Sequence, residues 1–231
     1  MIGKDYLGLL GSLLYAACMT RPDIAFYTAY LCQFMHSPSL PAWTAAIGVA
    51  AYLRKTSDLG LTYGGYPRAC CVHEATRSTP KCFADASFGV HTSPFGGGFI
   101  EWRNAAVVWF ARQLKFVPLS SCEVELAVMV VILKESVFFM NVLEFFDVKV
   151  DGPIYAITDN KAAYDVVRQP GTTKRTAHFS RWLHFARELY LHNKVDIILT
   201  VTTTMPADIL TKPGPAKAEF LKHRAYIMNL A

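Results

Sequence analysis

Apolar residues recur at helical spacing along the first 55 residues of the chain. The pattern predicts three helices, at residues 6–18, 22–35 and 41–55. Stops fall at Pro22 and Pro38, because proline is tolerated in the first turn of a helix but not in its interior. Residues 1–64 are therefore expected to form a helical segment.

A polar, irregular stretch follows, opening with Gly64-Gly65-Tyr66-Pro67 and running through Pro80. Glycine and proline interrupt regular structure, so this stretch is the best candidate for a boundary in the chain. We predict a linker at residues 65–80. The main domain is then expected at residues 81–215, with a C-terminal tail at residues 216–231.

Beyond the linker, strand patterns come first and then alternate with helical ones. Strands are predicted at residues 82–85, 95–102, 106–111, 154–158 and 195–201. Helices are predicted at residues 120–140, 160–169 and 176–192, with a last helix from about Pro206. Arg103-Asn104 is the expected hairpin turn between the second and third strands. Together the elements predict an α/β fold, with a mixed five-stranded sheet flanked by helices.

The composition is that of a chain that folds around a core. It has 231 residues, of which 52% are hydrophobic, and this excludes a disordered tail. Its six cysteines lie at irregular spacings, which fits reduced thiols in an intracellular protein better than a disulfide framework. Cys70, Cys71, His73 and Cys82 raise the alternative of a zinc site. Their spacing, however, does not match the paired spacings of structural zinc sites.

The N-terminus raises another alternative, because Lys4 and the apolar residues that follow resemble a signal peptide ending in Tyr-Ala-Ala-Cys. Asp5 lies where such a peptide should be positive, and the apolar pattern continues past Cys18 with helical spacing. A helix is therefore favoured. No apolar run approaches the roughly 20 residues of a membrane span, so no membrane partner is expected.

Four carboxylates, each in a short motif of its own, are the most informative feature of the chain. The motifs are Phe-Ala-Asp-Ala-Ser-Phe-Gly around Asp85, Ser-Ser-Cys-Glu-Val-Glu-Leu around Glu125, Ile-Thr-Asp-Asn around Asp159, and Ala-Asp-Ile-Leu-Thr-Lys around Asp208. Carboxylates brought together from separate elements repel each other unless they hold hard cations such as Mg²⁺. The set therefore indicates a two-metal nuclease site.

Each of these acids also has a structural alternative. Asp85 could cap a turn at the end of a strand, Asp159 could cap a helix, and Asp208 could serve only a helix dipole. Glu123 is assigned to structure, because Ser120 precedes it at the capping-box spacing and Glu123 can reach back to the Ser120 backbone N–H. Glu125 lies beyond the cap and is expected to face the sheet.

Basic residues concentrate in one part of the chain, although the net charge of +5 is modest. Between Lys161 and Lys194 there are seven Lys or Arg residues and only two acids, Asp165 and Glu188. Such a stretch can follow a phosphate backbone. The alternative is a solvated helix face with ordinary surface charge.

The four motifs resemble the ribonuclease H domain of copia-type retrotransposon polyproteins. The segment before them resembles the stretch that links the reverse transcriptase of such an element to its ribonuclease H, through Thr-Arg-Pro-Asp-Ile-Ala at residues 20–25, Met-His-Ser-Pro at 35–38 and Tyr-Leu-Arg-Lys-Thr-Ser-Asp-Leu-Gly-Leu at 52–61. The resemblance runs from about Tyr6 to Pro213, and several ordered motifs make chance agreement improbable. The Tyr-x-Asp-Asp-type motif of the polymerase palm is absent, so no polymerase active site is expected in this chain.

The resemblance implies a ribonuclease H-like fold and hydrolysis of the RNA strand of RNA–DNA hybrids. It implies two Mg²⁺ ions, with Mn²⁺ able to substitute, held by Asp85, Glu125, Asp159 and Asp208. It implies substrate contacts at Ser87, Asn160, Lys174, Arg175, His178 and Arg181, with Asn160 placed for sugar hydroxyls or base edges. Partners would be the hybrid and the remainder of the polyprotein.

The resemblance has two departures and leaves alternatives open. Lys174, Arg175, His178 and Arg181 match a basic run of the family in outline, but Ala177 stands where the family has a Lys. Related nucleases often carry a histidine in the loop before the last carboxylate, whereas residues 201–205 here contain none. This puts the turnover rate in doubt. The alternatives are an inactive nucleic-acid-binding or polymerase-connection module on the same fold, and a DNA-cutting relative of integrase or resolvase type. The expected location is intracellular, in the cytoplasm, in virus-like particles or in the nucleus.

Overall fold

The computed structural model describes residues 2–64, 79–88, 94–171, 176–212, 214 and 216–230, with side chains from residue 5 onward. The N-terminal part is helical, as predicted. It contains α1 (Ile2–Met19), η1 (Pro22–Ile24), α2 (Ala25–Leu31), η2 (Cys32–Phe34) and α3 (Leu40–Lys55). The Ser39 side chain accepts a hydrogen bond from Ala42 N and so caps α3, whose proline lies in the first turn, where it is tolerated.

A mixed five-stranded sheet forms the centre of the molecule. Its strands are β1 (Lys81–Ala86), β2 (Phe95–Trp102), β3 (Ala105–Gln113), β4 (Ile154–Thr158) and β5 (Val195–Leu199). They lie in the order β3-β2-β1-β4-β5, with the first three strands antiparallel and β4 and β5 parallel to β1. This is the ribonuclease H-like arrangement, and the predicted fold class is confirmed.

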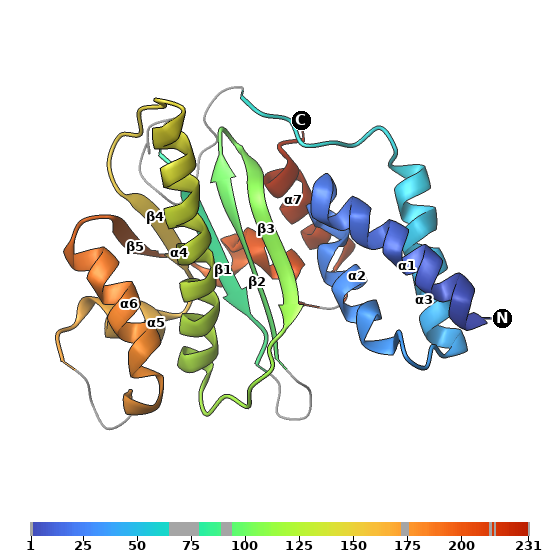
Figure 1. Ribbon diagram of the computed structural model, residues 1–231, viewed down its shortest axis with the longest axis horizontal. Helices are drawn as coiled ribbons and strands as arrows, with labels where there is room; N and C mark the ends of the chain where they lie inside the picture. Colours follow the sequence, from blue (N-terminus) through green and yellow to red (C-terminus); the bar gives the residue numbers. More distant parts are fainter. Residues whose placement is uncertain are drawn as a thin grey trace.

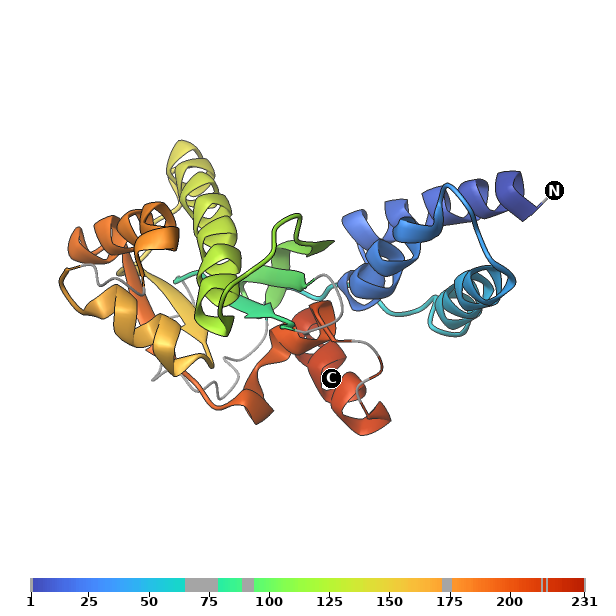
Figure 2. The same ribbon diagram turned by 90° about the horizontal axis from the view of Figure 1, so that it is seen from below.

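The two faces of the sheet are covered by different helices (Figure 1). One face packs against α4 (Ser121–Phe145), α5 (Lys161–Arg168) and α6 (Ser180–Leu191), through a core that includes Ile100, Leu126 and Leu183. The other face packs against α2, the short helix η5 (Pro206–Leu210) and α7 (Lys217–Met228), around Phe83 and Phe99. In Figure 2, α1 and α3 extend away from the sheet, with the N-terminus at their far end.

The C-terminal part differs from the prediction of one helix beginning near Pro206. The chain forms the 3-10 helix η5 and then, separately, α7. The sequence Pro213-Gly214-Pro215 lies between them, and proline cannot continue a helix because it lacks the backbone N–H. Residues 217–228, within the predicted tail, are thus helical and bury Ile227 and Met228. Most of the predicted linker, residues 65–78, lies outside the described residues.

α4 bears on the expectation that no apolar run approaches the length of a membrane span. Within the described residues, α4 alone is long and apolar enough to cross a membrane by those two measures. Half of its most apolar window is nevertheless buried inside the fold. It also buries Glu123 and Glu125 near its N-terminus. α4 is the central helix over one face of the sheet, and its buried side contributes to the core there.

Two backbone features set the shape of the antiparallel strands. The predicted hairpin turn is present, with Arg103 and Asn104 both at positive φ (53° and 72°), as a two-residue turn between right-twisted strands requires. Gly97 on β2 lies against η5, and a Cβ atom there would come within 2.5 Å of Leu210 Cβ and 2.8 Å of the Leu210 carbonyl oxygen. Glycine at this position therefore lets η5 pack directly on the sheet.

The helical segment is joined to the sheet by polar contacts as well as by apolar packing. The indole N–H of Trp109, on β3, donates to the Ala17 carbonyl oxygen at 2.7 Å. Tyr52 donates to Asp23 Oδ2 at 2.5 Å and accepts from Arg224, on α7, at 3.0 Å. These bonds connect α3, η1 and α7 across the boundary predicted from the sequence.

Candidate metal centre

Asp85 lies near the end of β1, the central strand of the sheet. It is only 2% exposed, because β1 is paired on both sides and covered on both faces. The Thr211 hydroxyl, just after η5, donates a short hydrogen bond to Asp85 Oδ2. The Asp85 side chain is therefore held by Thr211 and not by capping a turn. Its carboxylate lies within the core.

Two glutamates at the start of α4 have separate environments. The Ser120 side chain accepts from Glu123 N at 3.2 Å and caps the helix. Glu123 in turn accepts from the backbone N–H of Leu119 at 2.6 Å, one residue earlier than the predicted Ser120 N–H. Glu123 thus has the structural role that was predicted, but its carboxylate accepts from the Leu119 N–H and not from the Ser120 N–H. Glu125 is 6% exposed and accepts a hydrogen bond from the backbone of Ala86 on β1.

Asp159 immediately follows β4, the strand parallel to β1. The structural alternative for this residue was a helix cap, but the cap of α5 is its neighbour: the Asn160 side chain accepts from Ala163 N at 3.0 Å. Asp159 is only partly exposed and is left with its carboxylate at the sheet edge. Because parallel strands end at the same edge of a sheet, Asp159 lies beside Asp85.

Asp85, Glu125 and Asp159 meet as one cluster. One carboxylate oxygen from each lies within 4.8 Å of the other two. Burial, and then the charge of Asp208 and Asp159, raises the pKa of Asp85 to about 6, against the opposing effect of Lys212. Burial, followed by the charges of Asp85 and Asp159, raises the pKa of Glu125 well above its usual range. Asp85 and Glu125 thus resist ionisation where the acids converge.

The cluster fits a divalent cation by a test that does not depend on the motifs. Glu125 Oε2 is buried and has no hydrogen-bond partner among the described residues. An unsatisfied carboxylate oxygen in an apolar setting is costly, and a bound cation would satisfy it. All three side chains offer oxygen, the ligand that Mg²⁺ and Mn²⁺ prefer.

Asp208, the fourth predicted ligand, lies on η5 and is 5% exposed. Lys212 connects it to the cluster: its ammonium nitrogen lies 2.8 Å from Asp208 Oδ1 and 3.9 Å from Asp85 Oδ1. Burial lowers the pKa of Lys212, but the charges of Asp85 and Asp208 outweigh this and raise it. The positive charge of Lys212 therefore offsets the negative charge of Asp208 beside the cluster.

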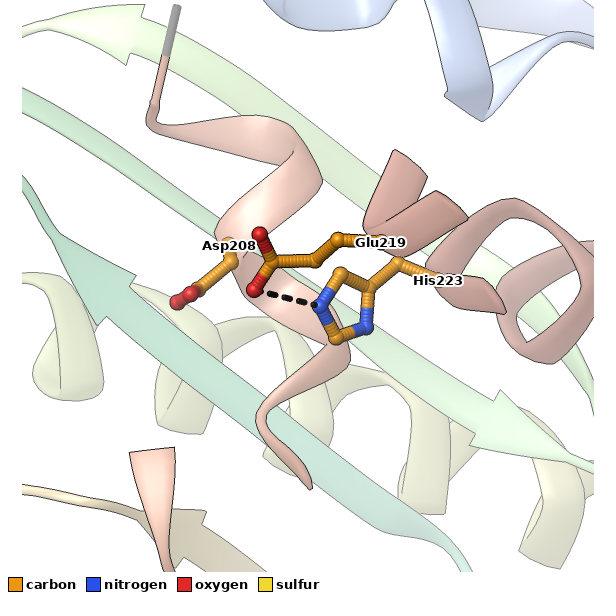
Figure 3. A group of neighbouring side chains, drawn as sticks. All are labelled: Asp208, Glu219 and His223. Atoms are coloured by element: carbon orange, nitrogen blue, oxygen red, sulfur yellow. Dashed lines mark ion pairs between the residues drawn. The ribbon is translucent and has the colours of Figure 1, made fainter. Parts of the chain in front are cut away.

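Asp208 also faces a second group of side chains, on α7 (Figure 3). Glu219 and His223 are four residues apart on that helix, and Figure 3 shows the Glu219 carboxylate lying between Asp208 and the imidazole. One ligand atom from each of the three lies within 4.8 Å of the others. His223 is 2% exposed, and its pKa is lowered by burial. Neither α7 residue was among the sequence-based candidates.

The predicted substrate contacts are placed unevenly. Arg181 is exposed on α6 and is accessible to a ligand. His178 Nε2 lies 3.4 Å from Glu123 Oε2, at the start of α4. Its nearest acid is therefore Glu123, which is assigned to structure. The Ser87 hydroxyl accepts from Phe95 N at 3.0 Å and closes the end of the β1–β2 pair. Asn160 uses its side-chain oxygen for the α5 cap. Lys174 and Arg175 lie outside the described residues, as do Cys70, Cys71 and His73 of the zinc alternative.

Comparison with known proteins shows which sequences the chain resembles. It is 27% identical over 221 residues to the Retrovirus-related Pol polyprotein from transposon TNT 1-94 of Nicotiana tabacum, a match covering 93% of this chain. It is 26% identical over 212 residues, 90% of this chain, to the Retrovirus-related Pol polyprotein from transposon RE2 of Arabidopsis thaliana. The chain is thus similar to one region of copia-type retrotransposon Pol polyproteins, and the predicted resemblance is confirmed.

The match covers a small part of those Pol polyproteins. This chain spans 16% of the TNT 1-94 polyprotein and 14% of the RE2 polyprotein. Its structure is also similar to that of LC11-RNase H1 in complex with RNA/DNA hybrid, with a TM-score of 0.41, 11% identity, and coverage of 58% of this chain and 94% of that one. No protein-family model matches the chain. Its ribonuclease H-like fold is assigned here from the sheet order.

Proposed function

We propose that this region of the copia-type Pol polyprotein is a metal-dependent ribonuclease H, which hydrolyses the RNA strand of RNA–DNA hybrids. The observation that carries the proposal is the convergence of Asp85, Glu125 and Asp159 within 4.8 Å, around a buried Glu125 oxygen that has no hydrogen-bond partner. These acids come from β1, α4 and the end of β4. A fold that needed them only as caps would not bury them together.

The chain's own residues would divide the work as follows. Asp85, Glu125 and Asp159 would hold Mg²⁺ or Mn²⁺, and Asp208 would join them from η5. Two bound divalent cations would supply an activated water and stabilise the negative charge that develops at the scissile phosphate. Thr211 holds the Asp85 carboxylate by its hydrogen bond. The β1 backbone fixes Glu125 through Ala86, so both acids are oriented before any substrate binds.

The proposed substrate is a hybrid duplex that approaches the sheet edge at Asp85 and Asp159. Its phosphates would be met by the basic stretch from Lys161 to Lys194, of which Arg181 is exposed on α6. We also propose that the remainder of the polyprotein, including its polymerase part, is a partner of this region. Removing a phosphate contact, for example by Arg175→Ala, should lower the salt dependence of hybrid binding.

The test is cleavage of a hybrid whose two strands carry different labels, with Mg²⁺ and with EDTA. Wild-type protein should cut only the RNA strand, and only with Mg²⁺. Asp85→Asn should abolish cutting, whereas a matched change at the exposed Asp58 should leave it intact. Cutting that survives Asp85→Asn, or cutting of the DNA strand, would overturn the proposal.

One observation favours a second candidate, a nucleic-acid-binding module without catalysis. Lys212 already neutralises Asp208 and lies 3.9 Å from Asp85, so the acids have a resident cation of their own. If the hybrid binds but stays intact under all divalent cations tried, this second function is supported. Cutting by the Lys212→Met variant alone would show that the lysine blocks a competent site.

A further inference from the structure

The group formed by Asp208, Glu219 and His223 is chemically different from the cluster around Asp85. The Asp85 cluster offers only carboxylate oxygens, whereas this group adds an imidazole nitrogen. Its members come from two elements, Asp208 from η5 and the other two from α7. The proposed nuclease function uses Asp208 but has no role for Glu219 or His223.

The His223 imidazole is the observation that asks for a ligand. Only 2% of its surface is exposed, and its Nε2 atom has no hydrogen-bond partner among the described residues. The nearest acid oxygen, Glu219 Oε1, is 3.8 Å away, beyond hydrogen-bond distance (Figure 3). A buried polar nitrogen without a partner is costly, so its position needs a compensating contact.

A plain ion pair between Glu219 and His223 is the simpler explanation, because residues four apart on a helix often pair. That ion pair is present, with the two atoms 3.8 Å apart, but this distance is too long for a hydrogen bond. Glu219 is 46% exposed, and Figure 3 shows its carboxylate between His223 and Asp208. One oxygen from each acid and one imidazole nitrogen thus lie within 4.8 Å of one another.

The spacing of these three ligand atoms is close to what one ion needs. Ligands held at about 2.1 Å from a first-row metal ion are roughly 3 Å apart, so the observed spacings would have to shorten by only about 1–2 Å. The half-exposed Glu219 side chain can supply most of this movement. Imidazole suits transition metals, whereas Mg²⁺ prefers sites built from oxygen alone.

We propose that Asp208, Glu219 and His223 form a binding site for a first-row transition-metal ion, which would cross-link η5 to α7. The site takes Co²⁺, Zn²⁺ or Mn²⁺ in preference to Mg²⁺. Its existence does not depend on the proposed nuclease activity, because two of its three ligands have no part in that activity. An ion bound there competes with Lys212 for the Asp208 carboxylate, which lies 2.8 Å from the lysine.

The probe is Co²⁺, added to the full chain in the presence of a large excess of Mg²⁺. The Mg²⁺ saturates the cluster of Asp85, Glu125 and Asp159. Visible absorption of Co²⁺ reports the geometry of its ligands, and an intense near-ultraviolet band reports thiolate ligands. Binding to cysteines is therefore separated from binding to this site. Wild-type protein should bind one equivalent of Co²⁺ in the presence of Mg²⁺, with visible absorption and without the thiolate band.

Variants locate the ion. Glu219→Gln changes a half-exposed side chain and should fold normally, and it should weaken Mg²⁺-resistant Co²⁺ binding by at least about 10-fold. His223→Gln should do the same. The matched control is Glu188→Gln on α6, where Glu188 and His192 have the same spacing but are both exposed and lack a third acid. This control should bind Co²⁺ like wild type.

Three outcomes would overturn the inference: no Mg²⁺-resistant visible band, a thiolate band only, or a band that Glu219→Gln leaves unchanged. Asp85→Asn separates this test from the nuclease test. That variant should lose hybrid cleavage while keeping the Co²⁺ spectrum. Loss of the Co²⁺ spectrum in Asp85→Asn would place the ion in the Asp85 cluster and would also refute the second site.

Discussion

Replacing Asp85 by asparagine should stabilise the metal-free protein and remove most of its response to Mg²⁺. Asparagine keeps nearly the same shape and can still accept the hydrogen bond from Thr211. It removes one negative charge from a site where burial, and then the charges of Asp208 and Asp159, raise the cost of ionising Asp85. A substitution in the buried centre of a sheet usually destabilises a protein, so stabilisation here is a distinctive result.

The magnitude follows from the pKa of Asp85, which is about 6 in the fold against 3.8 for an ordinary aspartate. One pH unit corresponds to about 1.36 kcal/mol, so ionising Asp85 at neutral pH lowers the free energy of unfolding by roughly 3 kcal/mol. Asparagine avoids this loss. The variant should therefore gain up to about 3 kcal/mol in EDTA at neutral pH.

The effect has a definite pH dependence. Because the folded pKa of Asp85 is raised, the stability linked to its protonation is fully present below pH 3.8 and is lost as the pH rises through about 6. The difference between variant and wild type should therefore be small near pH 4 and should reach its full size above about pH 7. The raised pKa of Glu125 acts in the same direction in both proteins.

The assay is urea unfolding followed by circular dichroism, in EDTA and in Mg²⁺, at pH 4.5 and pH 7.5. Wild type should be stabilised by Mg²⁺ at pH 7.5, and Asp85→Asn much less. Asp58→Asn, at an exposed position, serves as the control for loss of one charge. The reasoning is refuted if Asp85→Asn is less stable than wild type in EDTA at pH 7.5, or if Mg²⁺ stabilises the two proteins equally.

Three further changes test neighbouring parts of the site. Glu125→Gln should abolish hybrid cleavage in the labelled-strand assay and leave the fold intact. Glu123→Gln should lower the free energy of unfolding in urea by about 1 kcal/mol and keep activity. Equal loss of activity in the two variants would contradict the assignment. Lys212→Met should lower stability in EDTA and tighten Mg²⁺ binding measured by calorimetry, because the ion no longer displaces an ammonium; unchanged affinity would show that the lysine does not compete. Gly97→Ala should destabilise the fold by about 1–3 kcal/mol, because its new methyl group meets Leu210 at 2.5 Å, and a thermal melt like wild type would count against that contact.

The sheet could be predicted because its signals are local. The bounds of β2 and β4 agree with the expected strands at residues 95–102 and 154–158, and the Arg103-Asn104 turn lies where two residues that tolerate positive φ separate two apolar runs. The parallel pairing of β1 with β4 places Asp85 and Asp159 at one edge, which follows from the strand order. These parts of the candidate site could be anticipated before the fold was known.

Other parts could not be predicted, because they depend on contacts between distant segments. Lys212 belongs to a quoted motif and is four residues from Asp208, so the helical spacing hinted at their ion pair. Its approach to Asp85, 127 positions earlier in the chain, becomes visible only when η5 packs on β2. Glu219 and His223 lie beyond two prolines, in a stretch predicted as a tail, and no local pattern links them to Asp208.

The position of β1 has a consequence for how the site would fail. β1 is paired on both sides and buried along its length, so its backbone amides should exchange with solvent only when the whole domain unfolds. Asp208 is carried instead by the five-residue 3-10 helix η5, which is buried against the sheet but is not paired with it as a strand, so we expect η5 to open at a lower free energy than β1. Heating or mild denaturant should therefore displace the Asp208 carboxylate while Asp85, Glu125 and Asp159 keep their positions. Native-state hydrogen exchange would show this as two separate opening steps within the candidate metal centre.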